Sequence, residues 1–340
     1  MPTADARPST PGPEAGPGLA DSGDRAAAEE ASAFSHAPVP PDATQAYGSH
    51  PDQIVDFYRP RPAAPDRPVP LVALIHGGAW RAAYDRTHIS PLAAHLAAHG
   101  FAVASVEYRR GAPGTGQEPP ATAAGPATIG AGASAPQQPA EAAGPPEPDL
   151  PAAGRWPDTF DDIATALDAL PDLAVRALGA DAVDPGRTVV TGHSAGGHLA
   201  LWAAARHVLP LESPWHRASP PPYRGVVALA PIADFTSSIR LRVCSGAVLD
   251  LLGGTDRLEA RLPYADPAAL LPTGIATTIV HGTTDNEVPP QVSAAFARAA
   301  AAAGEEPTVA WLPATGHFPL IDPAAPACAA VADEIAQLAW

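Results

Sequence analysis

The sequence has no lysine: every one of its 20 basic residues is an arginine. This absence excludes the lysine of a P-loop, a Schiff base to substrate or pyridoxal phosphate, and a Ser-Lys catalytic dyad. Cysteine is almost as scarce, because only Cys244 and Cys328 occur among 340 residues. Since they lie far apart in a long chain, we expect free thiols and no disulfide framework.

Long apolar runs are missing as well. No run is long enough to span a bilayer, and the first residues lack the basic start and apolar core of a signal peptide. We therefore expect a cytoplasmic protein. The formal net charge of −16, from 36 acidic and 20 basic residues, argues against nucleic acid or an anionic membrane as a partner.

Two stretches are poor in large apolar side chains. Residues 1–45 and 111–154 consist mainly of Pro, Ala, Gly, Ser and acidic residues. Such segments cannot bury enough apolar surface to offset the entropy of the chain. We predict that residues 1–45 form a disordered extension, and that residues 111–154 are a low-complexity insertion in one folded domain, 46–340.

From residue 53 onward, short apolar runs alternate with stretches of helical apolar spacing. This alternation predicts an α/β fold with a doubly wound sheet, in which functional sites gather at the carboxyl ends of strands. The run at 53–58 alternates like an edge strand, and the run at 71–75 is apolar throughout, like a strand buried on both faces. Further strands are expected at 102–106, 188–191, 226–230, 277–280 and 308–312, and helices at 91–99, 158–170, 195–207, 290–303 and 323–338. Residues 232–272 break the rhythm and predict a cap whose apolar residues line an acyl pocket.

Gly192-His-Ser-Ala-Gly196 is a G-x-S-x-G sequence between a predicted strand and a predicted helix. A serine on such a sharp turn needs small neighbours, which Gly192 and Gly196 supply, and the following helix N-terminus favours developing negative charge. Ser194 is therefore the candidate nucleophile, the alternative being a glycine-rich turn with an incidental serine. We expect His193 and His198 to fill space or to form local hydrogen bonds.

A serine nucleophile needs a base and a group that orients the base. His317 follows the last predicted strand, and Asp285 follows the strand before it. The resulting chain order of serine, aspartate and histidine is that of an α/β-hydrolase triad. We predict that His317 is the general base and that Asp285 orients it, with Glu287 as the fallback acid. Asp285 as a loop cap and His317 as a surface histidine are the alternatives.

His76-Gly-Gly-Ala-Trp80 directly follows the buried strand at 71–75. Acyl transfer develops an oxyanion that backbone N–H groups can bind, and the tandem Gly77 and Gly78 let the backbone approach it. We assign this oxyanion hole to the N–H groups of three residues: Gly78, Ala79 and Ala195. We expect His76 to brace the loop, whereas Trp80 either lines the acyl pocket or simply packs.

With these motifs the sequence resembles the α/β-hydrolase superfamily, in the group of esterases, lipases and arylformamidases that carry an HGGxW or HGGG segment before a GHSAGG elbow. The resemblance runs from about Tyr47 to the C-terminus and includes the HGxxDxxVP segment at 281–289 and the GHF segment at 316–318. It implies a mostly parallel sheet with helices on both faces and a small cap, and a triad at positions 194, 285 and 317. Ala79 stands in place of the third glycine of HGGG, as in the arylformamidase-like branch.

No metal or cofactor is expected. His95 and His99 have the spacing of a zinc-binding helix, but Leu96 stands where the H-E-x-x-H pattern has its glutamate. A dinucleotide fingerprint is absent, and hydrolysis through a serine needs no cofactor.

These residues predict a serine hydrolase that cleaves a small carboxylic ester through an acyl-enzyme on Ser194, with a small-molecule ester or amide as its partner. An aryl formamidase acting on N-formylkynurenine-type amides is the alternative that the HGGxW segment suggests. A non-enzymatic ligand-binding module on a hydrolase fold is the alternative of another class. We do not expect an oligopeptidase, because that branch carries a large propeller before its catalytic domain, and here about fifty residues precede the first predicted strand.

Overall fold

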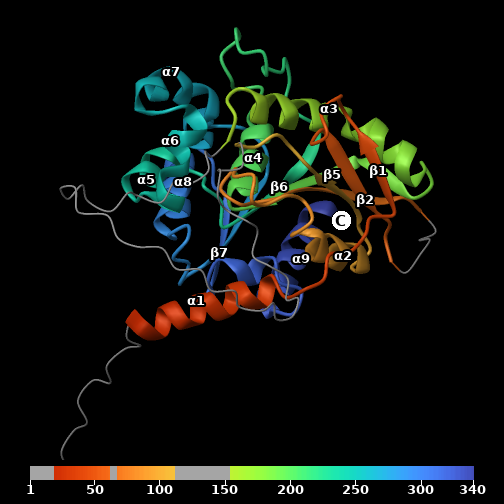
Figure 1. Ribbon diagram of the computed structural model, residues 1–340. Coiled ribbons are helices and arrows are strands. Elements are labelled where there is room, and N and C mark those ends of the chain that lie inside the picture. The colour runs from red at the N-terminus through yellow and green to blue at the C-terminus, as the bar shows by residue number, and fades with distance from the viewer. Residues whose placement is uncertain (1–18, 62–66, 112–153) are drawn as a thin grey trace, which may run out of the picture.

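The computed structural model describes residues 19–61, 67–111 and 154–340 (Figure 1). The expectations for residues 1–18 and 112–153 lie outside these ranges. The strands are β1 (Ala43–Ala46), β2 (Ile54–Tyr58), β3 (Val69–Ile75), β4 (Ala102–Val106), β5 (Val183–His193), β6 (Tyr223–Leu229), β7 (Thr277–Gly282) and β8 (Thr308–Leu312). The helices are α1 (Leu19–Ala33), α2 (Ser90–Ala98), α3 (Asp158–Leu178), α4 (Ala195–Ala204), α5 (Phe235–Arg240), α6 (Ala247–Leu252), α7 (Thr255–Ala265), α8 (Gln291–Ala302) and α9 (Pro326–Ala339), with 3-10 turns η1 (Val243–Gly246), η2 (Pro267–Leu270) and η3 (Phe318–Leu320). Among the described residues, no helix has both the length and the apolar character that crossing a membrane requires.

The strands form one sheet in the order β1-β2-β4-β3-β5-β6-β7-β8. β2 runs antiparallel to both of its neighbours, and the remaining neighbours pair in parallel. Successive side chains of a strand point to opposite faces, so Leu71 of β3 enters the core beneath α3 and α4, whereas Val72 enters the core beneath α2 and α9. The predicted α/β class, a mostly parallel sheet with helices on both faces, is confirmed.

The N-terminal segment is more ordered than its composition predicts, and the expectation of disorder for residues 1–45 is wrong for residues 19–45. Residues 19–33 form α1, the red helix at the lower edge of Figure 1, and residues 43–46 form β1. Polar contacts hold this segment where apolar side chains are few: Ser32 Oγ donates to Asp322 (2.6 Å) and Thr44 Oγ1 to Asp56 (2.6 Å). Because β1 pairs with β2, the strand expected at the sheet edge lies one position inside it.

The region predicted as a cap, residues 232–272, forms α5, α6 and α7 with the turns η1 and η2, grouped on one side of the molecule (Figure 1). The expectation that its apolar residues line an acyl pocket is wrong for most of them. Phe235, Val248 and Leu251 are fully or almost fully buried in the main core. Most of the apolar surface of the cap therefore packs against the body of the protein.

Candidate active site

Ser194 occupies a strained turn between β5 and α4, with φ 57° and ψ −116°. Positive φ is a strained conformation for a residue that has a side chain, and it persists only where the surrounding structure holds it. A Cβ atom at Gly196 would lie 2.1 Å from the carbonyl oxygen of Ile75, and one at Gly192 would lie 2.3 Å from that of Gly196. Both glycines are thus required because the turn packs directly against the end of β3.

His317 and Asp285 meet at the carboxyl end of the sheet. Nδ1 of His317 lies 2.6 Å from Oδ2 of Asp285, and both side chains are buried. Asp285 follows β7, and His317 lies between β8 and η3, so adjacent parallel strands bring the two residues together. Glu287, the fallback acid, is not the partner of His317: its backbone N–H donates to Asp285 Oδ1 (2.9 Å).

The surroundings of Asp285 hold it ionised. Oδ1 accepts hydrogen bonds from the backbone N–H groups of Glu287 and Val288, each at 2.9 Å, and His281 Nε2 lies 3.3 Å from Oδ2. Burial disfavours the charge of Asp285, but His317 and the hydrogen bonds outweigh burial and hold its pKa well below the usual range. An ionised carboxylate at this position fixes the imidazole orientation and favours a proton on Nδ1.

The glycine loop after β3 lies against the elbow. A Cβ atom at Gly77 would lie 2.8 Å from the carbonyl oxygen of His193 and 3.3 Å from Cβ of Ser194. Gly78, Ala79 and Trp80 all have positive φ, of 98°, 51° and 56°. This unusual run of left-handed residues turns the backbone beside the serine, where an oxyanion hole is needed.

His76 lies beneath this loop as a brace. Its Nε2 lies 2.9 Å from Oε1 of the buried Glu107, and its ring stacks on Tyr108 with centroids 4.4 Å apart. The Tyr108 hydroxyl donates to the carbonyl oxygen of His76 (2.9 Å). Burial, together with the nearby charge of Arg110, lowers the pKa of His76 to about 3, so the imidazole is neutral. The sequence singled out His76 but not Glu107, which stands in the Glu-Tyr-Arg-Arg segment after β4.

Ser194 and His317 open into one cavity of about 200 Å³, together with Gly78 and Ala79. Its remaining walls come from segments distant in the sequence: Phe34, Arg81, Tyr84, His88, His193, Cys244, Ser245, Glu287, Phe318 and Ile321. Sequence reasoning missed most of these residues. Tyr84 and His88 had one available signal, their position directly after the HGGAW segment, whereas Phe34 had none.

The remaining predicted site residues lie around the cavity without lining it. Ala195 is buried at the first turn of α4. Trp80 is fully buried and packs edge-on against His198, with ring centroids 5.1 Å apart, so of the two roles left open for Trp80 the structure favours packing. His198 Nε2 donates to the carbonyl oxygen of Ala265 (2.9 Å), which lies in α7, so its hydrogen bond is not the local one that we expected.

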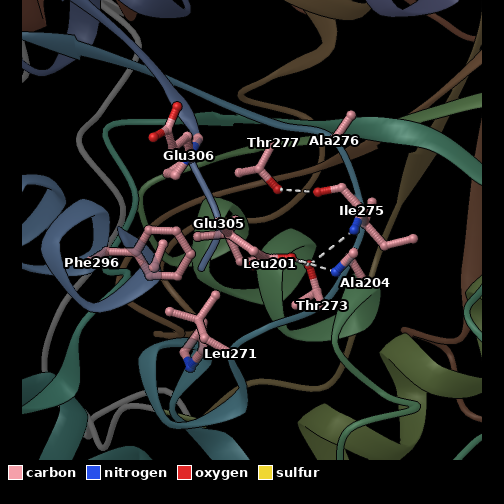
Figure 2. A pocket seen from close by; sticks show the side chains of 14 residues that line it. Leu201, Ala204, Leu271, Thr273, Ile275, Ala276, Thr277, Phe296, Glu305 and Glu306 are labelled. Carbon is pink, nitrogen blue, oxygen red and sulfur yellow. Dashed lines mark hydrogen bonds between the residues drawn. The ribbon is translucent and has the colours of Figure 1, made fainter. Parts of the chain in front are cut away.

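A second cavity of about 230 Å³ lies at the amino end of β7, away from Ser194 (Figure 2). Apolar side chains such as Leu201, Leu271 and Phe296 form much of its wall. Its charged lining residues are Glu305 and Glu306, and Glu305 accepts hydrogen bonds from the N–H of Gly274 and from Oγ1 of Thr273. The described lining residues include no histidine that could serve as a base for this hydroxyl.

Neither histidines nor cysteines form a metal site in the described ranges, where no group of three or more metal-ligating side chains occurs. His99 Nδ1 lies 2.8 Å from the carbonyl oxygen of His95, so these two residues form a hydrogen bond at the end of α2. Cys244 and Cys328 are free thiols, as the sequence predicts.

Two sequence families match the chain. The model of the prolyl oligopeptidase family covers residues 157–334, and a BD-FAE model covers residues 55–120. A probable isoprenylcysteine alpha-carbonyl methylesterase of Oryza sativa subsp. japonica is 25% identical over 260 residues, which are 74% of this chain and 51% of that protein. The chain thus spans about half the length of this curated relative.

Solved structures of esterases share the fold. A truncated carbohydrate esterase from gut microbiota gives a TM-score of 0.62 at 18% identity, over 89% of this chain and 99% of that one. Esterase B from Lactobacillus rhamnosis gives a TM-score of 0.62 at 20% identity, over 94% and 93%. The match to the prolyl oligopeptidase family spans more than half of the chain, including Ser194, Asp285 and His317. It corrects our expectation, drawn from the missing propeller, that the chain lies outside this family. The chain therefore belongs to the prolyl oligopeptidase family, among the esterase-like hydrolases of the α/β-hydrolase fold.

Proposed function

We propose that this protein is a serine hydrolase that cleaves a small carboxylic ester through an acyl-enzyme on Ser194. The observation that carries the proposal is the 2.6 Å contact between His317 and Asp285, formed beside the cavity that His317 shares with Ser194. A serine hydroxyl is a weak nucleophile, and a base oriented by a carboxylate is the arrangement that activates it.

In the proposed mechanism, Nε2 of His317 takes the proton of the Ser194 hydroxyl as the oxygen attacks the ester carbonyl. Asp285 keeps the proton on Nδ1 and stabilises the imidazolium that forms. Backbone N–H groups of Gly78, Ala79 and Ala195 bind the oxyanion. The imidazolium then protonates the leaving alcohol, and a water molecule activated by the same imidazole hydrolyses the acyl-enzyme.

An ester is favoured over a formamide by the size of the cavity. A formyl group is a single carbon, whereas the cavity of about 200 Å³ beside Ser194 and the glycine loop leaves room for a short acyl chain. Phe34, Tyr84 and Phe318 supply apolar walls in place of the cap residues that we had expected. The relatives support the same choice, since they are named as a methylesterase, a carbohydrate esterase and an esterase.

Fluorophosphonate labelling tests the proposal, because the probe phosphonylates an activated serine. We expect stoichiometric labelling of the wild type, none in Ser194→Ala, and retention in Ser245→Ala, which removes the other serine among the described residues that line the cavity. Ser194→Ala should also abolish hydrolysis, and His317→Ala should be about as damaging, because members of a triad act as a unit. An unlabelled wild type would favour the non-enzymatic binding module instead.

The aryl formamidase alternative is tested with the same preparation. Aryl esters from acetate to butyrate should have higher kcat/KM than N-formylkynurenine, with a shallow dependence on chain length of roughly tenfold to a few hundredfold per methylene at most. A clear preference for the formamide would make formamide hydrolysis the better description of this site.

A further inference from the structure

Helix α1 is fastened to the segment that carries His317. Oε1 of Glu29 accepts a hydrogen bond from the N–H of Gly316 (3.3 Å), the residue before His317. Ser32 Oγ donates to Asp322 (2.6 Å) just beyond η3, and Ala33 is buried in the core behind it. Figure 1 shows α1 along the lower edge of the protein, and the helix contacts η3, which is far from it in sequence. α1 is therefore a fixed part of the surroundings of the base.

A further cavity, of about 210 Å³, lies between α1 and the loops that hold Asp285 and His317. Its walls are Gly23, Ala26, Ala27, Glu29, Glu30, Asn286, Glu287, His317 and Phe318. Of the three residues proposed as the triad, His317 lines both this cavity and the one at Ser194, whereas Ser194 and the glycine loop line only the latter. The imidazole thus stands between two spaces.

In ester cleavage the two cavities would bind different parts of the substrate. The acyl carbon is bonded to Ser194 and its oxygen faces the glycine loop, so the acyl chain occupies the first cavity. The leaving oxygen receives its proton from His317, so the alcohol must lie on the side of the imidazole. The cavity beneath α1 shares Glu287, His317 and Phe318 with the cavity at Ser194, so an alcohol that begins beside the imidazole can extend into it.

We propose that α1 forms the binding site for the alcohol part of the ester, so that the N-terminal segment determines which leaving groups the enzyme accepts. This inference rests on the proposed ester hydrolysis. The small side chains of Gly23, Ala26 and Ala27 leave the space open, and a Cβ atom added at Gly23 would meet no atom within 4 Å. The site therefore takes an alcohol larger than methanol or ethanol.

The negative charge of the residues that line the cavity beneath α1 restricts the class of alcohol that it can bind. Among the described residues, the cavity is lined by the carboxylates of Glu29, Glu30 and Glu287 and by Asn286, and by no lysine or arginine, while Arg25, outside this lining, pairs with Glu29 (4.0 Å). An anionic leaving group would meet like charge there, which opposes binding. The alcohol is accordingly a neutral or cationic one.

The end of α1 also reaches the acyl side. Phe34, which directly follows the helix, packs edge-on against Phe318, with ring centroids 5.4 Å apart, and lies 5.9 Å from the rings of Tyr84 and His88. It lines the cavity at Ser194 but not the cavity beneath α1. One segment thus contributes separate residues to the two cavities, and this separation makes the proposal testable.

The test fills the space beneath α1. Ala27→Phe adds a ring at a position that lines this cavity, and Ala28→Phe adds the same ring at the neighbouring position, which is also exposed but does not line the cavity. Both changes have the same intrinsic effect on a helix. We would measure kcat/KM of the wild type and both variants for ethyl butyrate and benzyl butyrate, which differ in the alcohol. Ethyl hexanoate, which differs from ethyl butyrate in the acyl chain, distinguishes effects on the cavity at Ser194 from effects on the cavity beneath α1.

Ala27→Phe should lower kcat/KM for benzyl butyrate about tenfold or more relative to ethyl butyrate, while Ala28→Phe retains the wild-type ratio. Phe34→Ala should change the ratio of ethyl hexanoate to ethyl butyrate and leave the benzyl-to-ethyl ratio unchanged. An unchanged benzyl-to-ethyl ratio in an Ala27→Phe enzyme that still hydrolyses ethyl butyrate would overturn the inference. If Ala27→Phe does not fold, Ala26→Phe serves as the second filling variant. Failure of the proposed function itself is distinct, since it appears as Ser194→Ala retaining hydrolysis.

Discussion

His193 packs its ring against that of His317, with centroids 4.3 Å apart, and its Nε2 donates to the backbone carbonyl oxygen of His317 at 3.0 Å. His193 is the variable residue of the G-x-S-x-G turn, next to Ser194 in the chain. Burial, with the adjacent His317, lowers its pKa well below the ordinary value, so the ring is neutral and donates through a single nitrogen. The turn that carries Ser194 thus also holds the loop that carries His317.

Replacing His193 by phenylalanine keeps a ring but removes the donor. The lost hydrogen bond amounts to about 1 kcal/mol, so we expect kcat for an aryl butyrate to fall about fivefold with KM little changed, because the base is misplaced while the cavity remains. His193→Gln retains a donor and should recover part of the loss. Equal kcat values for His193→Phe and the wild type would show that His193 only fills space.

Glu107 connects the brace beneath the oxyanion loop to the rest of the core. Its carboxylate accepts hydrogen bonds from the backbone N–H groups of Tyr108 and Arg86, both at 3.0 Å, and contacts His76 and the guanidinium of Arg110. Glu107 is 1% exposed, and Arg110 is largely buried. The pair therefore lies where an unpaired charge is costly.

We expect Glu107→Leu to lower the free energy of unfolding by about 3–5 kcal/mol, because it leaves the charge of Arg110 without its partner. Urea denaturation measures this change. The control is Asp184→Asn, which breaks the half-exposed pair of Asp184 with Arg187 and should cost about 1 kcal/mol or less. Similar losses in the two variants would contradict the structural role given to Glu107.

The strands and the catalytic candidates were predictable because each left a local pattern. β3 is buried on both faces and so reads as an unbroken apolar run, and Ser194 sits in a turn that only glycines can flank. Asp285 and His317 could be placed because parallel strands present their carboxyl ends at one edge. Their contact follows from topology.

The N-terminal segment and the cavity walls were not predictable, because their contacts are distant in the sequence and polar. α1 is held by Glu29 and Ser32, whose partners lie almost three hundred residues away, and its apolar residues are alanines apart from Leu19. The helix expected at 158–170 continues instead through Pro171 to Leu178 as α3. In that case the buried face of a long amphipathic helix outweighs the backbone cost of one proline.

Asp266 gives the cap a dependence on pH. Its Oδ1 accepts hydrogen bonds from the backbone N–H groups of Phe235 (3.2 Å) and Ala268 (3.1 Å), which joins η2 to α5. Burial, aided by the nearby Asp234, raises its pKa to about 7. The folded protein therefore holds a proton that the unfolded chain releases near pH 4. The stabilisation is complete below that pH and is lost as the pH rises to about 7, by roughly 4 kcal/mol in total.

Asp266→Asn should remove much of this dependence, since an amide oxygen accepts the same two hydrogen bonds without ionising. Urea midpoints measured at pH 5 and pH 8 should differ by less in Asp266→Asn than in the wild type, and the variant should be the more stable protein at pH 8. Parallel pH profiles in the two proteins would show that Asp266 does not carry the effect.

The last prediction concerns residues 112–153. The flanking residues Gly111 and Gly154 both donate their backbone N–H groups to one acceptor, the carbonyl oxygen of Trp80, at 3.1 Å and 2.8 Å. The two ends of the segment therefore lie side by side, and a short connection can join them. Replacing residues 113–152 with a short Gly-Ser linker should leave kcat/KM within a fewfold of the wild type. Because closing a shorter loop costs less entropy, the free energy of unfolding should rise by about 1–2 kcal/mol, as measured in urea. A loss of folding or of hydrolysis in this variant would mean that the segment contributes contacts to the body of the protein or to the cavity at Ser194.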